Sequence, residues 1–149
     1  MTYPTFALPD PETQPEFYSD VTSKRFFAWV LDMVFIGFLS GVAVLLTAFT
    51  GLFFFPLLLL VVGFGYRVLT LASGSATWGM RFVAIEFRDE TGAPFDMTKA
   101  VMHTLGYSIS LSLFPLQLIS IVLMLTTQRK QGLTDHLMGS VAINRTARY

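Results

Sequence analysis

The chain has 149 residues, the length of one domain, but 53% of them are hydrophobic and only 13% are charged, with a mean hydropathy of +0.59. This composition is too apolar for a soluble domain and indicates a membrane protein, whose main partner is the lipid bilayer. Ten basic and ten acidic residues cancel, which argues against a nucleic-acid partner, and the absence of cysteine and of closely spaced histidines predicts no disulfide, metal site or cofactor.

Residues 1–20 are rich in proline and acidic side chains. Such a segment can bury little apolar surface, so we expect a disordered, Pro-rich cytoplasmic tail, followed by one membrane domain over residues 21–145. The segment lacks the basic start, short apolar core and small-residue cleavage site of a secretory signal. We therefore expect the first apolar run to be a retained membrane span.

Two apolar helices are predicted next. No residue from Met33 to Tyr66 carries a formal charge, and as one helix this stretch would be about 51 Å long against a hydrocarbon core of about 30 Å. A turn at Thr50 and Gly51 divides it into helices over residues 26–47 and 52–71. Arg67 lies near the far end of the second helix, where its side chain is expected to reach the membrane interface.

Gly37 and Gly41 form a GxxxG spacing on the first of these helices. Small residues at this spacing favour close helix packing in membranes. We expect this face to pack against the second helix, with a homo-oligomer interface as the alternative.

Two segments have strand-like sequences. Residues 80–88 are rich in β-branched and aromatic side chains and are followed by a turn at Asp89 to Gly92, after which residues 93–95 could begin a return strand. Residues 140–144 form the second strand-like segment. These two segments can pair only if they lie on the same side of the membrane.

The run from Ala100 to Gln128 again carries no formal charge, and Pro115 lies near its middle. It predicts either a single tilted span or a pair of short helices over residues 97–113 and 116–128, with Asp96 as the N-cap of the first. A pair places all ten basic residues on the cytoplasmic side, as the positive-inside tendency favours. We therefore expect a bundle of four short membrane helices with a small cytoplasmic β-hairpin or sheet and both termini in the cytoplasm; three membrane helices are the alternative.

Charged and polar side chains within the apolar segments are the candidate functional residues. Asp32 is the only formal charge inside the first apolar run, and it lies two helical turns, about 10 Å, from Arg25 on the same face. A carboxylate in this position is usually paired, hydrated or titrated. We expect Arg25 to pair with Asp32 and also to reach Asp135, which follows the last span, so that two carboxylates share one arginine. The third predicted helix carries a polar stripe at steps of three or four residues, formed by Asp96, Lys99, His103, Tyr107 and Ser110. We expect this stripe to face the bundle, with a membrane-surface helix as the alternative.

Three motifs resemble the RDD family of small bacterial membrane proteins: RFFAWVLD at 25–32, TWGMRFVAIEFRDETGAPFD at 77–96 and QGLTDHLMGSVAINR at 131–145. By motif position, Arg25, Asp32 and Asp135 match the arginine and two aspartates after which the family is named. Many members carry lysine where this chain has Met80 and arginine where it has His103. The resemblance implies a location in the bacterial inner membrane and a charged cluster of Arg25, Asp32 and Asp135. We add His103 and Arg67 as candidate members of this cluster.

Two functions follow from these expectations. The first is a structural or accessory membrane protein, in which the charged cluster holds the helices and the cytoplasmic loop in register. The alternative is a cation/proton antiporter or a transporter subunit, in which Asp32 binds a proton or a monovalent cation and His103 tunes it. The sequence contains no G-x-S-x-G, H-E-x-x-H or P-loop spacing, so we do not expect an enzyme.

Overall fold

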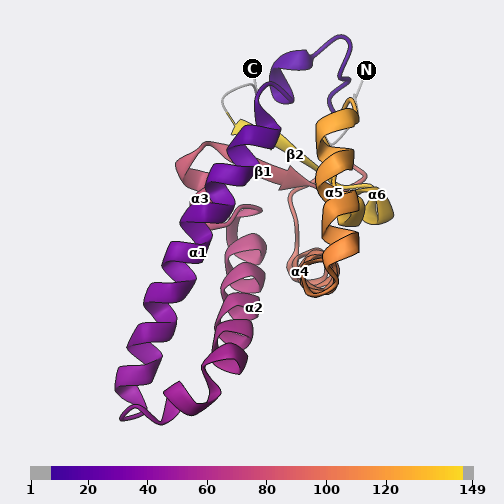
Figure 1. The fold of residues 1–149 in the computed structure, drawn as a ribbon. Helices are drawn as coiled ribbons and strands as arrows, with labels where there is room; N and C mark the ends of the chain where they lie inside the picture. The colour runs from indigo at the N-terminus through magenta and orange to yellow at the C-terminus, as the bar shows by residue number, and fades with distance from the viewer. Residues whose placement is uncertain (1–7, 146–149) are drawn as a thin grey trace.

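The computed structural model describes residues 8–145, which form a mostly helical structure with one two-stranded sheet (Figure 1). The elements in chain order are η1 (Pro15–Phe17), α1 (Val21–Leu46), η2 (Thr50–Phe54), α2 (Phe55–Gly74), α3 (Trp78–Phe82), β1 (Ile85–Arg88), α4 (Met97–Ser112), α5 (Phe114–Thr126), α6 (Leu133–Met138) and β2 (Val141–Asn144).

Helices α1 and α2 form a long apolar hairpin that extends away from the sheet (Figure 1). They are the two helices of the described chain that are long and apolar enough to cross a membrane, and counting α4 and α5 as one span would make three. Phe53, at the tip of the hairpin, is 84% exposed. Helix α1 begins at Val21, five residues earlier than the sequence predicts, so Arg25 lies within the helix and not before it.

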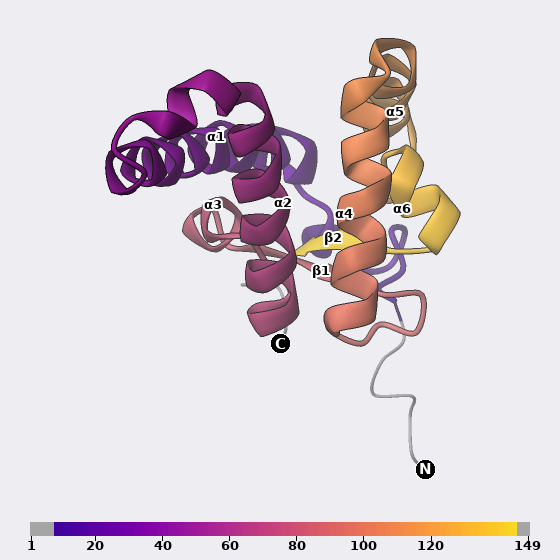
Figure 2. The same cartoon turned by 90° about the horizontal axis from the view of Figure 1, so that it is seen from below.

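Helices α4 and α5 are bent by 115° at Leu113. Pro115 is at the start of α5, where it removes a backbone donor and prevents α4 from continuing. The bend is clear from two directions, because α4 is seen along its axis in Figure 1 and along its length in Figure 2. The break expected near Pro115 is therefore present.

Strands β1 and β2 pair antiparallel, with Ile85 opposite Asn144 and Arg88 opposite Val141. The sheet thus joins segments far apart in sequence and is not a local hairpin. The prediction of a strand over residues 80–88 is wrong in its first half, because Thr77 caps helix α3 by accepting a hydrogen bond from the backbone N–H of Met80. The expected return strand at 93–95 does not form either; the backbone N–H of Phe95 donates instead to Ser75 Oγ.

Of the segment expected to be a disordered tail, Leu8, Phe17 and Tyr18 pack against the sheet; residues 1–7 lie outside the described residues. Phe17 and Tyr18 are buried against Val141 and Ile143 of β2. The side chains of alternate strand residues point to opposite faces, and Ala142 packs in the main core on the other face. This N-terminal segment therefore covers an apolar sheet face that would otherwise be exposed.

The glycines of α1 do not pack against α2. A Cβ atom added at Gly37 or Gly41 would meet no atom within 4 Å, so the expected intramolecular contact of this GxxxG face is wrong. The close approach is instead at Gly79 of α3, where a Cβ atom would lie 2.2 Å from the carbonyl oxygen of Ala28 and 2.7 Å from Asp32 Oδ1. Only a glycine permits α3 to lie this close to α1.

We predict that Gly79→Ala destabilises the protein by about 1–3 kcal/mol or more, because the methyl group would overlap the α1 backbone. Gly37→Ala is the matched control, since it adds the same methyl group to an open helix surface and should be neutral or stabilise by up to about 1 kcal/mol. Thermal unfolding of the purified variants in detergent measures both effects. Equal stabilities for the two variants would contradict the close packing of α3 on α1.

Candidate functional site

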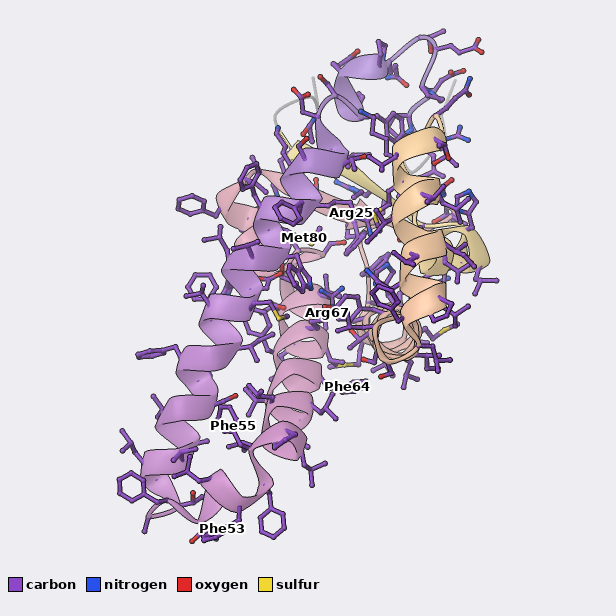
Figure 3. The ribbon with its side chains drawn as sticks, in the orientation of Figure 1. Arg25, Phe53, Phe55, Phe64, Arg67 and Met80 are labelled. Atoms are coloured by element: carbon purple, nitrogen blue, oxygen red, sulfur yellow. The ribbon has the colours of Figure 1, made fainter. Side chains whose placement is uncertain are left out.

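A cavity of about 340 Å³ lies between the α1–α2 hairpin and the α4–α5 pair. Figure 3 shows Arg25 and Arg67 in this region, far from Phe53 at the tip of the hairpin. The structure brings all five residues of the predicted charged cluster to the cavity wall; these are Arg25, Asp32, Arg67, His103 and Asp135.

Asp135 is fully buried and connects four parts of the chain. Its carboxylate accepts hydrogen bonds from Arg25 Nη1 of α1 (2.5 Å), from Ser140 Oγ (3.0 Å) before β2 and from the backbone N–H of Gly132 (3.0 Å) before α6, and His103 Nε2 of α4 lies 2.8 Å away. Burial alone would raise the pKa of Asp135, but the charge of Arg25 and the hydrogen bond from His103 outweigh this effect and hold the pKa well below its usual range. Asp135 is therefore ionised at any physiological pH.

The hydrogen bonds of His103 identify its protonation state. Because Asp135 is ionised, the proton of this contact is on Nε2 of the imidazole, which donates it. The other ring nitrogen, Nδ1, is buried and has no hydrogen-bond partner among residues 8–145, and the ring packs against Phe87 and Phe95. A second proton on Nδ1 would leave a buried charged donor unpaired, so the neutral tautomer is favoured.

Asp32 is 2% exposed and is held by three neutral donors. Tyr66 Oη of α2 donates to Oδ1 at 2.6 Å, Thr77 Oγ1 donates to Oδ2 at 2.7 Å, and the backbone N–H of Gly79 donates to Oδ1 at 2.9 Å. Of the two carboxylates expected to share Arg25, Asp135 forms a salt bridge with it, whereas no salt bridge joins Arg25 to Asp32. Asp32 instead fastens α1 to both α2 and α3.

The sequence predicts that the Arg67 side chain reaches the membrane interface, but this prediction is wrong. Arg67 is 8% exposed and borders the cavity. Its guanidinium carbon lies 4.0 Å from the centre of the Tyr107 ring, a cation–π contact. Tyr107 is held in place by the indole N–H of Trp29, which donates to its hydroxyl at 2.8 Å. No described residue accepts a hydrogen bond from Arg67, and its Nε is buried without a partner.

The polar stripe of α4 divides into two parts. His103, Tyr107 and Ser110 face the cavity, as expected for a stripe that faces the bundle. Asp96 caps the helix by accepting from the backbone N–H of Lys99, as the sequence predicts. At this end of α4 the stripe therefore faces away from the cavity, and the ammonium group of Lys99 is 2.8 Å from the partly exposed Glu90.

The sequence did not single out Tyr66 or Gly79 as partners of Asp32. Gly79 and Thr77 lie within the TWGMRF segment, so the motif contained a signal, although not which residue it would contact. Tyr66 is one aromatic residue in an apolar helix and has no sequence signal of its own. Gln117, which accepts from Ser110 Oγ at 3.0 Å across the α4–α5 bend, was likewise not recognised.

A model of the RDD family matches residues 21–139, which is most of the chain. The chain belongs to the RDD family. Searches of curated proteins and of solved structures found no match. In this RDD-family chain the arginine and the two aspartates of the family motif do not form one cluster of ion pairs. Arg25 pairs with Asp135, whereas Asp32 accepts hydrogen bonds from neutral donors alone.

We predict an interaction free energy of about 0.5–3 kcal/mol between Arg25 and Asp135 in a double-mutant cycle of Arg25→Gln and Asp135→Asn. Either single change leaves a buried polar group without its partner, and the double change removes both charges. The measurement is the free energy of unfolding in mixed micelles.

The matched control for this cycle is Lys99→Gln with Glu90→Gln, an ion pair of similar distance that is solvated. Its interaction free energy should not exceed about 1 kcal/mol. Additive effects of the Arg25 and Asp135 changes would show that the buried pair does not couple α1 to α6.

Proposed function

We propose that this RDD-family protein is a structural or accessory membrane protein whose two buried carboxylates lock the helices and the sheet into one arrangement. The observation that carries the proposal is the environment of Asp32, which is buried and has all three of its donors from the protein. A carboxylate that carries ions must exchange its partners, whereas these donors come from α2 and α3 and are fixed by the fold.

The sheet supports a topology in which both ends of the α4–α5 pair lie on one side of the bilayer. Strand β1 precedes α4, and β2 follows α5 and α6, yet the two strands are paired. A backbone-paired sheet cannot have its strands on opposite sides of a membrane, so α4 and α5 together cross it twice or not at all. With α1 and α2 crossing as a hairpin, the sheet, residue 8 and residue 145 share one side.

The basic residues favour the cytoplasmic side of the bacterial inner membrane for the sheet. Lys24, Arg81, Arg88 and Arg145 lie on or beside the elements at this end of the molecule, and Arg129 follows α5 at the same end (Figure 1). An excess of lysine and arginine is typical of cytoplasmic segments. The four short helices predicted from the sequence are compatible with this arrangement if α4 and α5 enter the bilayer and return.

Cation/proton exchange is the second candidate, because Asp32 borders the cavity and an ion there would lie near its carboxylate. Two features weigh against it. The lone pairs of Asp32 already accept three hydrogen bonds, and Arg25 and Arg67 on the same wall balance the two carboxylates, so the cavity has no net negative charge to attract a cation. The scaffold function therefore accounts better for the geometry.

We predict that Asp32→Asn lowers the free energy of unfolding by about 2–4 kcal/mol, because an amide cannot accept all three donors and presents its own NH₂ group to one of them. Asp96→Asn is the control, since asparagine replaces aspartate at an exposed helix cap with little cost. Folded yield and thermal unfolding are measured together with sodium-driven proton flux in liposomes. A stable Asp32→Asn protein that loses a robust wild-type flux would overturn the scaffold proposal.

We also predict that single cysteines at Thr91 and Gln128 label from the cytoplasmic side, and a cysteine at Phe53 from the opposite side. Thr91 lies between β1 and α4, Gln128 follows α5, and Phe53 is at the tip of the α1–α2 hairpin. The chain has no other cysteine. Intact cells and inverted vesicles are treated with a membrane-impermeant thiol reagent. Labelling of Thr91→Cys and Gln128→Cys from opposite sides would show that α4 and α5 form one span.

A further inference from the structure

We propose that the cavity binds an anionic amphiphile, with its carboxylate or phosphate oxygens on the guanidinium of Arg67 and its acyl chain along the apolar wall. The first argument is that Arg67 lacks an acceptor. It is 8% exposed, borders the cavity, and contacts the face of Tyr107 without donating a hydrogen bond to any described residue. A guanidinium has five N–H donors in a planar fork that matches a carboxylate or a phosphate.

The oxygen atoms around Arg67 are already used by other donors. Asp135 accepts from Arg25 and three further groups, and Asp32 accepts from three neutral donors; neither carboxylate is within 4.0 Å of Arg67. The hydroxyl of Tyr107 accepts from Trp29. Asp32 and Asp135 balance the positive charges of Arg25 and Arg67. The N–H groups of Arg67 still lack acceptor oxygens within hydrogen-bond distance, and a ligand can supply these.

The rest of the cavity wall is suited to a hydrocarbon chain. Phe26 on α1 and Leu111, Phe114 and Ile121 on α4 and α5 line it, and these side chains are also exposed on the surface of the bundle, Phe114 at 69%. Figure 2 shows the α1–α2 hairpin on one side and the α4–α5 pair on the other. A chain whose head group is on Arg67 can therefore continue along this wall into the surrounding lipid.

The size of the cavity agrees with a head group and the first part of a chain. Its volume of about 340 Å³ is at the lower end of the range of about 300–1,000 Å³ that is typical of ligand pockets. A fatty acid and an anionic phospholipid share the required chemistry, an acidic head group on an acyl chain. The binding experiment distinguishes these two sources.

The test is native mass spectrometry of the delipidated full chain in a neutral detergent, titrated with oleate, dioleoylphosphatidylglycerol, dioleoylphosphatidylcholine or inorganic phosphate. We expect saturable binding of oleate or of the phosphatidylglycerol, and weaker binding of the zwitterionic phosphatidylcholine. Arg67→Gln should weaken binding by about 30-fold or more, as loss of one partner of a buried charged contact does. Arg67→Lys keeps the positive charge but lacks the planar fork of donors, so its affinity should lie between those of the wild type and of Arg67→Gln.

Two further variants make the test specific to the cavity. Lys130→Gln removes the same charge from the loop after α5, outside the cavity, and should change affinity by less than about twofold because a partly exposed charge outside the site is screened by solvent. Leu111→Trp leaves Arg67 intact but fills the cavity from a partly exposed position, so it should abolish binding while the protein stays folded.

The outcomes separate clearly. Binding of oleate alone identifies a fatty-acid site, and binding of the phosphatidylglycerol identifies a lipid head-group site; both support the proposal. Equal affinity for phosphatidylcholine, unchanged binding in Leu111→Trp, or binding of phosphate without either amphiphile would overturn it. If Arg67→Gln does not fold, the lipid comparison in the wild type and the Leu111→Trp variant still decide. The Asp32 experiment is independent of this result.

Discussion

The ion pair between Arg25 and Asp135 is the interaction on which the rest of the structure depends. A carboxylate with no exposed surface is tolerable only when its partners are all in place, and its partners come from α1, from α4 and from the segments before α6 and β2. These segments span more than a hundred residues of sequence. The charged cluster thereby makes the membrane helices and the sheet assemble as one cooperative unit, since a partial structure would leave Asp135 or Arg25 buried alone.

Asp32 shows a second solution to the same physical problem. It accepts hydrogen bonds from neutral groups, one of which is a backbone N–H near the start of α3. A carboxylate near a helix N-terminus interacts favourably with the partial positive charge there, so the short helix α3 and the buried Asp32 stabilise each other. Gly79 is required for this arrangement, because any side chain would separate α3 from α1. The two acidic residues thus connect different parts of the chain to α1. Asp135 does so at Arg25, and Asp32 does so two helical turns further along the helix.

The sequence predicted the features that arise from local physics. The α1–α2 hairpin follows from apolar length and a Thr-Gly turn, the break before α5 from Pro115, and the start of α4 from the cap at Asp96. The failures concern choices between distant partners. The sequence predicts that Arg25 is shared by Asp32 and Asp135, but only the pair with Asp135 forms, where α6 packs against α4. Likewise, the strand propensity of residues 80–84 is overridden by the Thr77 cap, and Phe17 and Tyr18 pack on the sheet because β2 presents an apolar face.

Arg67 illustrates why the fold can hold a polar group that its own partners do not satisfy. It lies seven residues before the end of α2, about 10 Å along the axis, so its side chain meets α4 before it can reach the interface. A desolvated cation–π contact contributes about 2 kcal/mol, less than the several kcal/mol that burial of an ion costs. The rest of the fold must outweigh this difference in free energy. Tyr66, the residue before Arg67, fixes helix α2 to α1 through its hydrogen bond to Asp32. This contact holds the guanidinium of Arg67 at the cavity with its N–H donors available.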